Sequence, residues 1–240
     1  MLRVRPAVES DLKLILYLID EAADWLRAKG INQWNAPWPN EIERDARVKR
    51  GLEGHRTWIV EDDGIPIATI SARPDANSDL WAESEQDDPA VYVSRLVVSR
   101  SYAGAGVGAE LVNWVGMWAR KQYGARWIRI DVWTTNIALH SYYQKEGFRF
   151  LRFCDDVDYP SAALFQRSTD DIRSTDVPRL EEKPKLIKPD KPVRLVVRRP
   201  GQWWRQFSRA GQDSSQRVFM APEEIDPCTQ PRPKPTQAIQ

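Results

Sequence analysis

A glycine-rich turn between an apolar strand pattern and an amphipathic helix pattern is the feature that most constrains this chain. Residues 96–98 end the strand pattern, and the turn that follows carries Gly104, Gly106 and Gly108 at alternate positions. Glycine removes the side chains that keep a ligand away from the main chain, and the first turn of a helix leaves several N–H groups without intrahelical partners. The helix dipole adds about half a positive charge there. The sequence therefore predicts a loop that binds a phosphate or pyrophosphate group.

The same glycines leave two kinds of ligand open. Gly104-x-Gly106-x-x-Ala109 also satisfies a dinucleotide fingerprint, and Asp131 stands about where the ribose-binding acid of such a site falls. In the dinucleotide version the first glycine follows its strand almost at once, whereas residues 99–103 intervene here. This spacer argues against NAD.

A second set of motifs follows the loop. An apolar strand pattern at residues 127–133 precedes Asn136 and a short helical pattern that ends in Tyr-Gln-Lys-Glu-Gly-Phe at residues 143–148. Asn136 and Tyr143 are seven residues apart, about two helical turns, so we expect both side chains to face one cleft. Together with the loop at residues 103–108, these motifs resemble those of the GCN5-related N-acetyltransferases (the GNAT family).

The resemblance implies acetyl-CoA as the donor substrate. In this family two parallel strands part to admit pantetheine, and the glycine loop binds the pyrophosphate. The residues that the resemblance assigns to the coenzyme are Leu96, Val97, Val98, Ala103, Gly104, Ala105, Gly106, Val107, Gly108, Ala109 and Asn136. The family loop usually begins with Arg or Gln, and this chain has Ala103 instead. Arg100 and Arg120 are candidates to supply the missing contact.

Acetyl transfer to an amine needs a base, a donor for the carbonyl oxygen and an acid for the departing thiolate. The resemblance assigns the acid to Tyr143, whose alternative is a packing role, and the oxygen donor to the backbone of the strand before the loop. Some family members place a glutamate base on that strand, but Ser94 and Arg95 stand there. Asp131 is the remaining candidate, acting through water. Its alternative is a structural ion pair with Arg95 or Arg129.

The order of patterns predicts an α/β fold with a mixed central sheet flanked by helices, matching the family over residues 1–168. The expected elements are a strand at 2–6, a helix capped by Ser10-Asp11 and ended by Gly30, a helix capped by Asn40 and ended by Gly51, a hairpin of 57–61 and 65–71, a polar insert at 78–89, a strand at 91–98, a helix at 107–122, a strand at 127–133, a helix at 138–145, and strands at 148–153 and 162–166.

The composition changes after the predicted domain. Ten of the 17 prolines lie in residues 168–240, so we expect residues 169–240 to form a largely disordered tail. Its apolar cluster, residues 193–199 and 203–207, mixes basic and aromatic side chains. We expect this cluster to pack back on the domain or to mediate self-association as a homodimer, rather than to bind a membrane or single-stranded nucleic acid. The net charge of +1 likewise gives no reason to expect a nucleic-acid partner.

Several other classes are not supported by the sequence. No run of 18 apolar residues and no signal-peptide core is present, so a cytoplasmic location is expected. Cys154 and Cys228 are too few and too far apart for a disulfide framework and are expected to be free thiols. His55 and His140 form no paired metal-ligand spacing with them, so no metal is expected.

The amine that accepts the acetyl group is not identified by the sequence. Tryptophans are concentrated in the first half of the chain, at Trp25, Trp34, Trp38, Trp58 and Trp81. The segment 30–39 joins the first two helices, where family members commonly build one wall of the acceptor site. These aromatic side chains are expected either to hold a flat or cationic amine or to serve as core and lid packing.

Two functions from different classes follow. The first is an N-acetyltransferase that moves the acetyl group of acetyl-CoA to a primary amine of a small molecule or peptide, by direct attack in a ternary complex. The alternative is a non-catalytic sensor of coenzyme A or a nucleotide, suggested by Ala103 and by the absence of the strand glutamate. Turnover with an amine library distinguishes the two.

Overall fold

The computed structural model describes residues 2–182, apart from 37–38, 155–156, 158 and 178. The strands are β1 (Leu2–Pro6), β2 (Thr57–Asp62), β3 (Ile65–Arg73), β4 (Ala90–Val98), β5 (Trp127–Val132), β6 (Arg149–Phe153), β7 (Ala163–Ser168) and β8 (Leu180–Glu182). The α-helices are α1 (Leu12–Ala28), α2 (Glu41–Glu53), α3 (Glu83–Gln86), α4 (Val107–Tyr123) and α5 (Ile137–Lys145).

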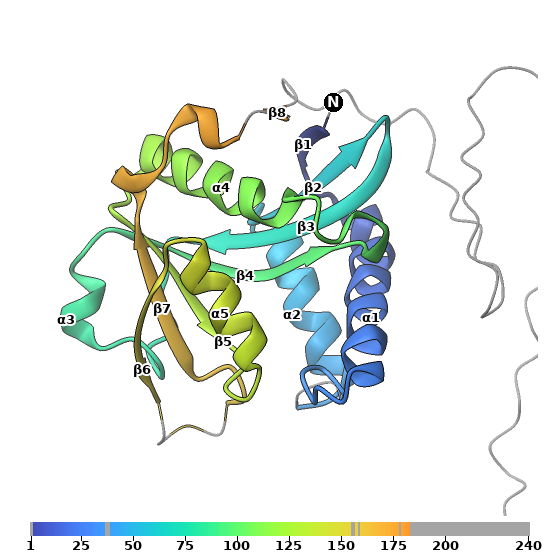
Figure 1. Cartoon of the computed structure of the whole chain (residues 1–240), viewed down its shortest axis with the longest axis horizontal. Helices are drawn as coiled ribbons and strands as arrows, with labels where there is room; N and C mark the ends of the chain where they lie inside the picture. Colours follow the sequence, from blue (N-terminus) through green and yellow to red (C-terminus); the bar gives the residue numbers. More distant parts are fainter. Residues whose placement is uncertain (1, 37–38, 155–156, 158, 178, 183–240) are drawn as a thin grey trace, which may run out of the picture. The chain divides into compact units, whose positions relative to one another are not determined.

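All eight described strands form one mixed sheet in the order β6-β7-β5-β4-β3-β2-β1-β8. The pairs β4–β5 and β1–β8 are parallel, and the other neighbouring pairs are antiparallel. Helix α4 covers one face of the sheet, and α1 and α2 lie against the other (Figure 1). The α/β class and the flanked mixed sheet expected from the sequence are confirmed.

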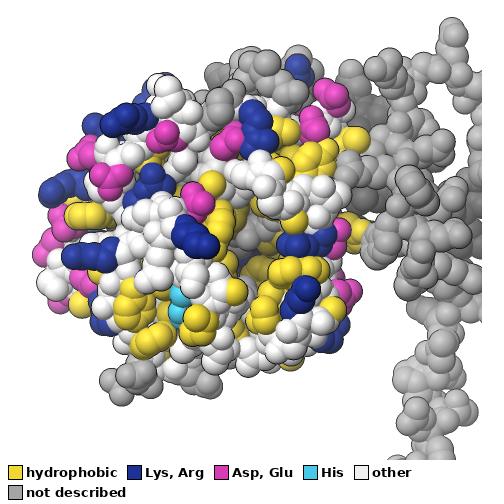
Figure 2. All heavy atoms as spheres, in the orientation of Figure 1, with side chains coloured by type: hydrophobic (Ala, Val, Ile, Leu, Met, Phe, Trp, Pro, Cys, Tyr) yellow, Lys and Arg dark blue, Asp and Glu magenta, His cyan; other side chains and the backbone are white. Residues whose placement is uncertain are grey.

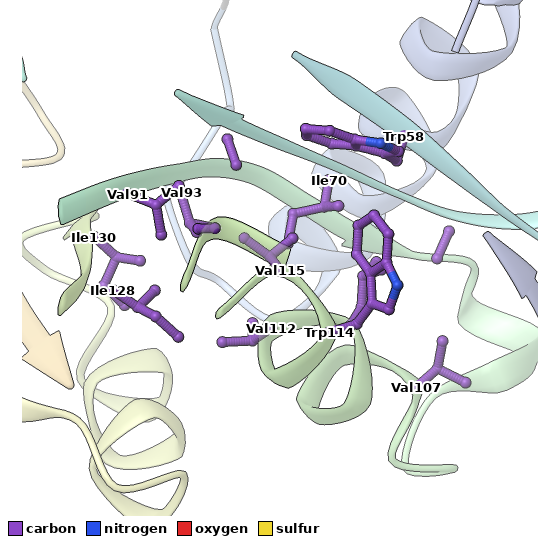
Figure 3. Close-up of a cluster of buried hydrophobic side chains, with 14 of the residues drawn as sticks. Trp58, Ile70, Val91, Val93, Val107, Val112, Trp114, Val115, Ile128 and Ile130 are labelled. Carbon is purple, nitrogen blue, oxygen red and sulfur yellow. The ribbon is translucent and has the colours of Figure 1, made fainter. Parts of the chain in front are cut away.

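The face under α4 carries the largest core cluster. Val112 and Val115 of α4 pack among side chains from the strands, including Ile70, Val93 and Ile128 (Figure 3). Tyr143 of α5 and residues of β7 belong to the same cluster. Alternate residues of each strand point to opposite faces, so this cluster takes every second residue of the strands that it contacts. It holds the start of α4, and with it the glycine turn, against the sheet.

The opposite face is covered in two parts. Apolar residues of α1 such as Ile15 and Leu18 pack with Val48 and Leu52 of α2 against the sheet. Next to them, Leu80 and Trp81 cover the face of β4 and β7. The cap of α2 is confirmed, because the Asn40 side chain accepts a hydrogen bond from the Glu43 N–H at 2.9 Å. The cleft described below opens beside these helices.

A β-bulge divides β4 into two parts. Its pairing with β3 shifts between Ser94 and Val97, so that β4 holds one extra residue there, and Arg95 has a φ of 49°. The pairing of β4 with β5 ends at Val93 and Ile130. The carboxyl-terminal half of β4 therefore has no partner strand on its β5 side within the described residues, and the two parallel strands part at this point.

The expected cap of α1 is not formed, because the Asp11 carboxylate accepts from the Val8 N–H instead of from the start of the helix, and three further expectations for the fold differ from the structure. Gly51 does not end α2 but lies inside it, where a Cβ would meet Thr57 Oγ1 at 2.9 Å, so glycine here permits close packing of helix and sheet. The insert at 78–89 is not only polar, because it buries Leu80 and Trp81 and includes α3. Leu80 and Trp81 are two adjacent apolar residues in an otherwise mostly acidic stretch, so no helical or strand periodicity marked them as buried.

The third difference concerns the domain boundary expected at residue 168. Residues 169–182 pack on the domain: β8 pairs with β1, and Ile172 and Leu180 join the core under α4. The Thr169 side chain donates to the Ala125 carbonyl at 2.8 Å. The folded part therefore continues to at least residue 182. The rest of the predicted tail, with Cys228 and the apolar cluster at 193–199 and 203–207, lies outside the described residues.

Candidate active site

The glycine turn presents a row of N–H groups with no partner in the described part of the chain. Gly104 and Gly106 have φ of 77° and 78°, a backbone conformation that glycine adopts at little cost. No hydrogen bond reaches their N–H groups, or those of the first three residues of α4, within the described residues. Gly108 is close to Tyr142, whose hydroxyl would lie 3.1 Å from a Cβ at that position. This geometry suits an anionic ligand at the amino end of α4.

The arginines that were candidates to replace the missing loop side chain are engaged elsewhere. The Arg100 guanidinium stacks on Trp25 at 3.8 Å from the ring centre, and Arg120, in the last turn of α4, pairs with Asp170. A different cation lies at the turn. Arg179 donates to the Ala105 carbonyl at 2.6 Å and pairs with Glu110 of α4. Sequence reasoning missed Arg179 because it is placed beyond the expected domain end.

Tyr143 lies on the α4 side of the point where β4 and β5 part. Its ring packs between Phe148 and Tyr142, with centroids 5.4 and 5.2 Å away, so it does have the packing contacts of the alternative interpretation. Its hydroxyl makes no hydrogen bond within the described residues, and it is not among the fully buried polar atoms that lack a partner there, so it remains accessible to a ligand. Burial, followed by the nearby Tyr142 and Asp131, raises the pKa of Tyr143 well above its usual range, so the hydroxyl keeps its proton at neutral pH.

Asn136 does not lie on the helix face with Tyr143 but at the cap of α5. Its Oδ1 accepts from the Leu139 N–H at 3.1 Å, and its Nδ2 donates to Gln33 Oε1 at 2.6 Å. Both side chains are buried. These contacts fix the start of α5 and tie it to the segment between α1 and α2. A contact of Asn136 with the coenzyme stays a prediction.

A cleft of about 450 Å³ lies between α1 and α2 on one side and the ends of β4 and β5 on the other. Figure 2 shows the surface hollowed between α5 and these two helices, with apolar side chains on both sides of the hollow. Asn32 holds Trp133, one of the cleft residues, because its Oδ1 accepts from Trp133 Nε1 at 3.0 Å and from Thr135 Oγ1 at 2.8 Å. The volume is typical of a site for a small molecule.

Charged side chains of both signs line this cleft. They are Asp20, Asp24, Glu41 and Asp131, and Arg27, Arg44, Arg47 and Arg95. Several pair with one another near the opening: Arg44 with Asp20 at 2.9 Å, and Arg27 with Asp24 at 2.7 Å. Asp131 and Arg95 lie instead where β4 and β5 part, just beyond the last paired residues of the two strands.

Asp131 is a residue of β5, directly after the last residue that pairs with β4. Its side chain lines the cleft, on the sheet face opposite Tyr143. Its side chain accepts a hydrogen bond from the Tyr159 hydroxyl at 3.3 Å. It pairs with neither Arg95 nor Arg129, the two partners that the sequence suggested. Arg129 instead donates to the Tyr92 hydroxyl and to Gln166. Burial raises the pKa of Asp131 to about 6, against the opposing effects of Tyr159 and of nearby arginines.

The tryptophans are divided between cleft and core. Trp34 lines the cleft, together with Trp133, which sequence reasoning did not assign to the acceptor site. Trp58 and Trp81 are buried core residues, and Trp25 covers Arg100. Trp38 lies outside the described residues. An aromatic wall therefore exists, but only part of it comes from the expected set.

Other expectations concern thiols, metals and membranes. Cys154 is a free, partly buried thiol, as expected, and its Sγ contacts the Leu80 carbonyl at 3.5 Å. The residues that the structure describes contain no cluster of three or more His, Cys, Asp or Glu suited to a metal ion. Within the same residues, no helix combines the length and the apolar character needed to cross a membrane.

The comparison with protein families decides the class. The model of the acetyltransferase (GNAT) family matches residues 19–148, which include the glycine turn, the parted strands and most of the cleft. The chain belongs to the GNAT family. A curated relative, the uncharacterized N-acetyltransferase YesJ of Bacillus subtilis, is 30% identical over 149 residues, which are 61% of this chain and 81% of that protein. The chain is thus an N-acetyltransferase, and its family uses acetyl-CoA.

Solved structures of GNAT proteins show the same fold. An acetyltransferase from Listeria monocytogenes superposes with a TM-score of 0.56 at 22% identity, covering 69% of this chain and 93% of that one. The PaiA N-acetyltransferase of Thermoplasma acidophilum, solved in complex with coenzyme A, gives a TM-score of 0.54 at 19% identity, covering 70% and 99%. Both cover nearly all of the neighbour's length, so the GNAT fold accounts for most of the described residues.

Proposed function

We propose that this GNAT protein transfers the acetyl group of acetyl-CoA to a primary amine of an acceptor bound in the cleft, by direct attack in a ternary complex. Acetyl-CoA supplies the acetyl thioester. The observation that carries the proposal is the position of Asp131 and Tyr143, which approach the parted strands from opposite faces of the sheet.

The residues at the loop fit the coenzyme. The free N–H groups at Gly104, Gly106 and the start of α4 are donors for a pyrophosphate. The half of β4 at residues 96–98, with no partner on its β5 side, offers backbone groups for pantetheine and for the carbonyl oxygen. The coenzyme contacts predicted for Ala103, Ala105, Val107 and Ala109 rest on this assignment.

Asp131 and Tyr143 would divide the proton transfers. Asp131 lines the cleft in which the acceptor would lie, and with a pKa of about 6 its carboxylate is ionised at neutral pH and can take a proton from the amine through water. Tyr143 keeps its proton, and its hydroxyl is free to donate to the departing sulfur. The two groups have opposite protonation states at one pH, which an acid–base pair requires.

Replacing Asp131 by Asn tests the base. The D131N protein should lose about 100-fold in kcat with its best amine acceptor while coenzyme A binding, measured by calorimetry, stays within about twofold. In the parent protein kcat/KM should rise with pH through about 6, because only the ionised carboxylate accepts a proton, and this step should be absent in D131N. D88N is a matched control, since Asp88 pairs with Arg126 at the surface.

Parental rates in D131N, with the pH step retained, would contradict the assignment of the base. Binding of coenzyme A without release of free thiol from acetyl-CoA, with any amine of a broad library, would instead support the non-catalytic sensor.

A further inference from the structure

Arg95 is a partly buried cation in the cleft without a carboxylate partner. Its Nε donates to Ser71 Oγ at 3.3 Å, and within the described residues no other hydrogen bond and no ion pair reaches its guanidinium. Helix α2 packs directly over it, since a Cβ at Gly51 would lie 3.1 Å from Arg95 Nη2. Its Nη atoms are not among the fully buried polar atoms that lack a partner in the described residues, so they remain accessible to a ligand.

The backbone at Arg95 adds a second, independent observation. Its φ of 49° is a conformation that non-glycine residues rarely adopt, and it occurs at the bulge where β4 departs from β5. Bulges next to active sites commonly redirect a side chain. Here the bulge brings Arg95 into the lining of the cleft, together with Ser94 before it.

Opposite charges meet in this part of the cleft without neutralising each other. Asp131 lines the same cleft, yet it forms no ion pair within 4.0 Å with Arg95. Each group influences the pKa of the other by electrostatic interaction alone, without a direct contact. Arg47 and Arg73 add positive potential around Arg95. A ligand that bridges the two groups would need a cation or amine at one end and an oxyanion at the other.

We propose that the acceptor is a small amino acid-like molecule, in which a carboxylate or similar oxyanion binds Arg95 while the primary amine lies toward Asp131. This inference rests on the proposed function, since it names the substrate class of the same site. Arginine suits this task because its planar fork can donate two parallel hydrogen bonds to a carboxylate. The cleft of about 450 Å³ is large enough for a free amino acid.

Matched acceptors test the charge requirement. The probes are free α-amino acids, the corresponding decarboxylated amines and amino acid amides, and the diamine putrescine, each with acetyl-CoA and with free thiol as the readout. For a given side chain, kcat/KM should be at least about 10-fold higher with the carboxylate than with the amide or the bare amine. Equal rates across a matched set, or faster turnover of putrescine, would overturn the proposal.

The variant R95N links this preference to Arg95. Asparagine tolerates the left-handed backbone and removes the charge. R95N should lose about 10- to 100-fold in kcat/KM with the amino acid and little with the decarboxylated amine, so the preference should vanish. R95K, which keeps the charge, should retain part of it. R126N, at the exposed Arg126, is the matched control and should behave like the parent. An equal loss for all acceptors in R95N would contradict the proposal.

A binding measurement separates this inference from the proposed function. N-acetylated amino acids, the products expected, are titrated into parent and R95N proteins saturated with coenzyme A, and thermal unfolding reports whether R95N is folded. Binding to the parent but not to folded R95N supports the anion subsite even if no amine is acetylated, in which case only the proposed function fails. Absence of binding to the parent, or equal binding by both proteins, overturns the inference.

Discussion

The glycine turn and the cleft proposed to bind the acceptor are built in different ways. The turn consists of neighbouring residues, and its binding groups are backbone N–H donors at Gly104, Gly106 and the start of α4. The cleft is assembled from α1, α2, β4, β5 and the segment at 159–161, and its chemistry comes from side chains. A backbone site depends on conformation and tolerates many side chains, whereas a side-chain site changes with each substitution. One family can therefore keep a common donor site while the acceptor site varies.

A truncation at residue 168 should have the largest effect on stability. It should weaken the core cluster under α4, the helix that follows the glycine turn. A chain ending at 168 lacks Leu180 and Ile172, and the Ile172 side chain packs directly against Gly116 of α4. Removing two such core residues should lower the free energy of unfolding by at least ~3 kcal/mol in a urea titration. A chain ending at 182 is the control. Equal stability of the two chains would show that the segment only rests on the domain.

The variant G106V should remove coenzyme binding. Valine is strained at the φ of 78° and its branched side chain blocks the approach of a phosphate to the backbone. We expect coenzyme A affinity to fall by ~100-fold or more in calorimetric titration. G124V is a matched control, because Gly124 has a φ of 64° at the opposite end of α4. It should show similar strain and parental affinity. Parental affinity in G106V, or tighter binding of NAD than of coenzyme A by the parent, would contradict the pyrophosphate assignment.

Tyr143 is the acid that we propose for the reaction between the two regions, and removing its hydroxyl tests that role. Y143F keeps the ring contacts with Phe148 and Tyr142 but loses the proton donor. We expect kcat to fall ~10- to 100-fold, about 1.4 to 2.7 kcal/mol of barrier, with coenzyme binding largely kept. The low end reflects the fact that a thiolate is a fair leaving group. An unchanged kcat would leave Tyr143 with the packing role alone.

The smallest effect is expected at Arg179. R179M removes a cation next to the turn, where it contacts the Ala105 carbonyl and Glu110. We expect coenzyme A affinity to fall ~3- to 10-fold at low salt, and less at high salt, because a partly exposed charge is screened. R120M is the control, since Arg120 pairs with Asp170 at the far end of α4. Tighter binding in R179M would show that the arginine competes with the coenzyme for the turn.

Much of the fold could be predicted because its signals are local. The hairpin between β2 and β3 follows from Asp63 and Gly64, which have φ of 48° and 81° as a two-residue hairpin turn requires. The cap at Asn40 formed as expected. The end of α2 was wrong, because a glycine can end a helix or admit a close neighbour, and only the packing against Thr57 distinguishes the two. The core role of Trp81 was missed because two apolar residues within an acidic stretch show no periodicity.

By itself, the sequence determined the glycine turn, the order of strands and helices, and the family resemblance, since each rests on residues close together along the chain. The tertiary structure decided which distant side chains meet: Arg179 with the turn, Asp131 with Tyr159, and Arg95 with the other residues that line the cleft. A bulge or a cleft results from the packing of whole elements, and no local pattern records it. The glycine turn proposed for the donor was therefore visible in the sequence, whereas only Trp34 and its segment of the proposed acceptor cleft were.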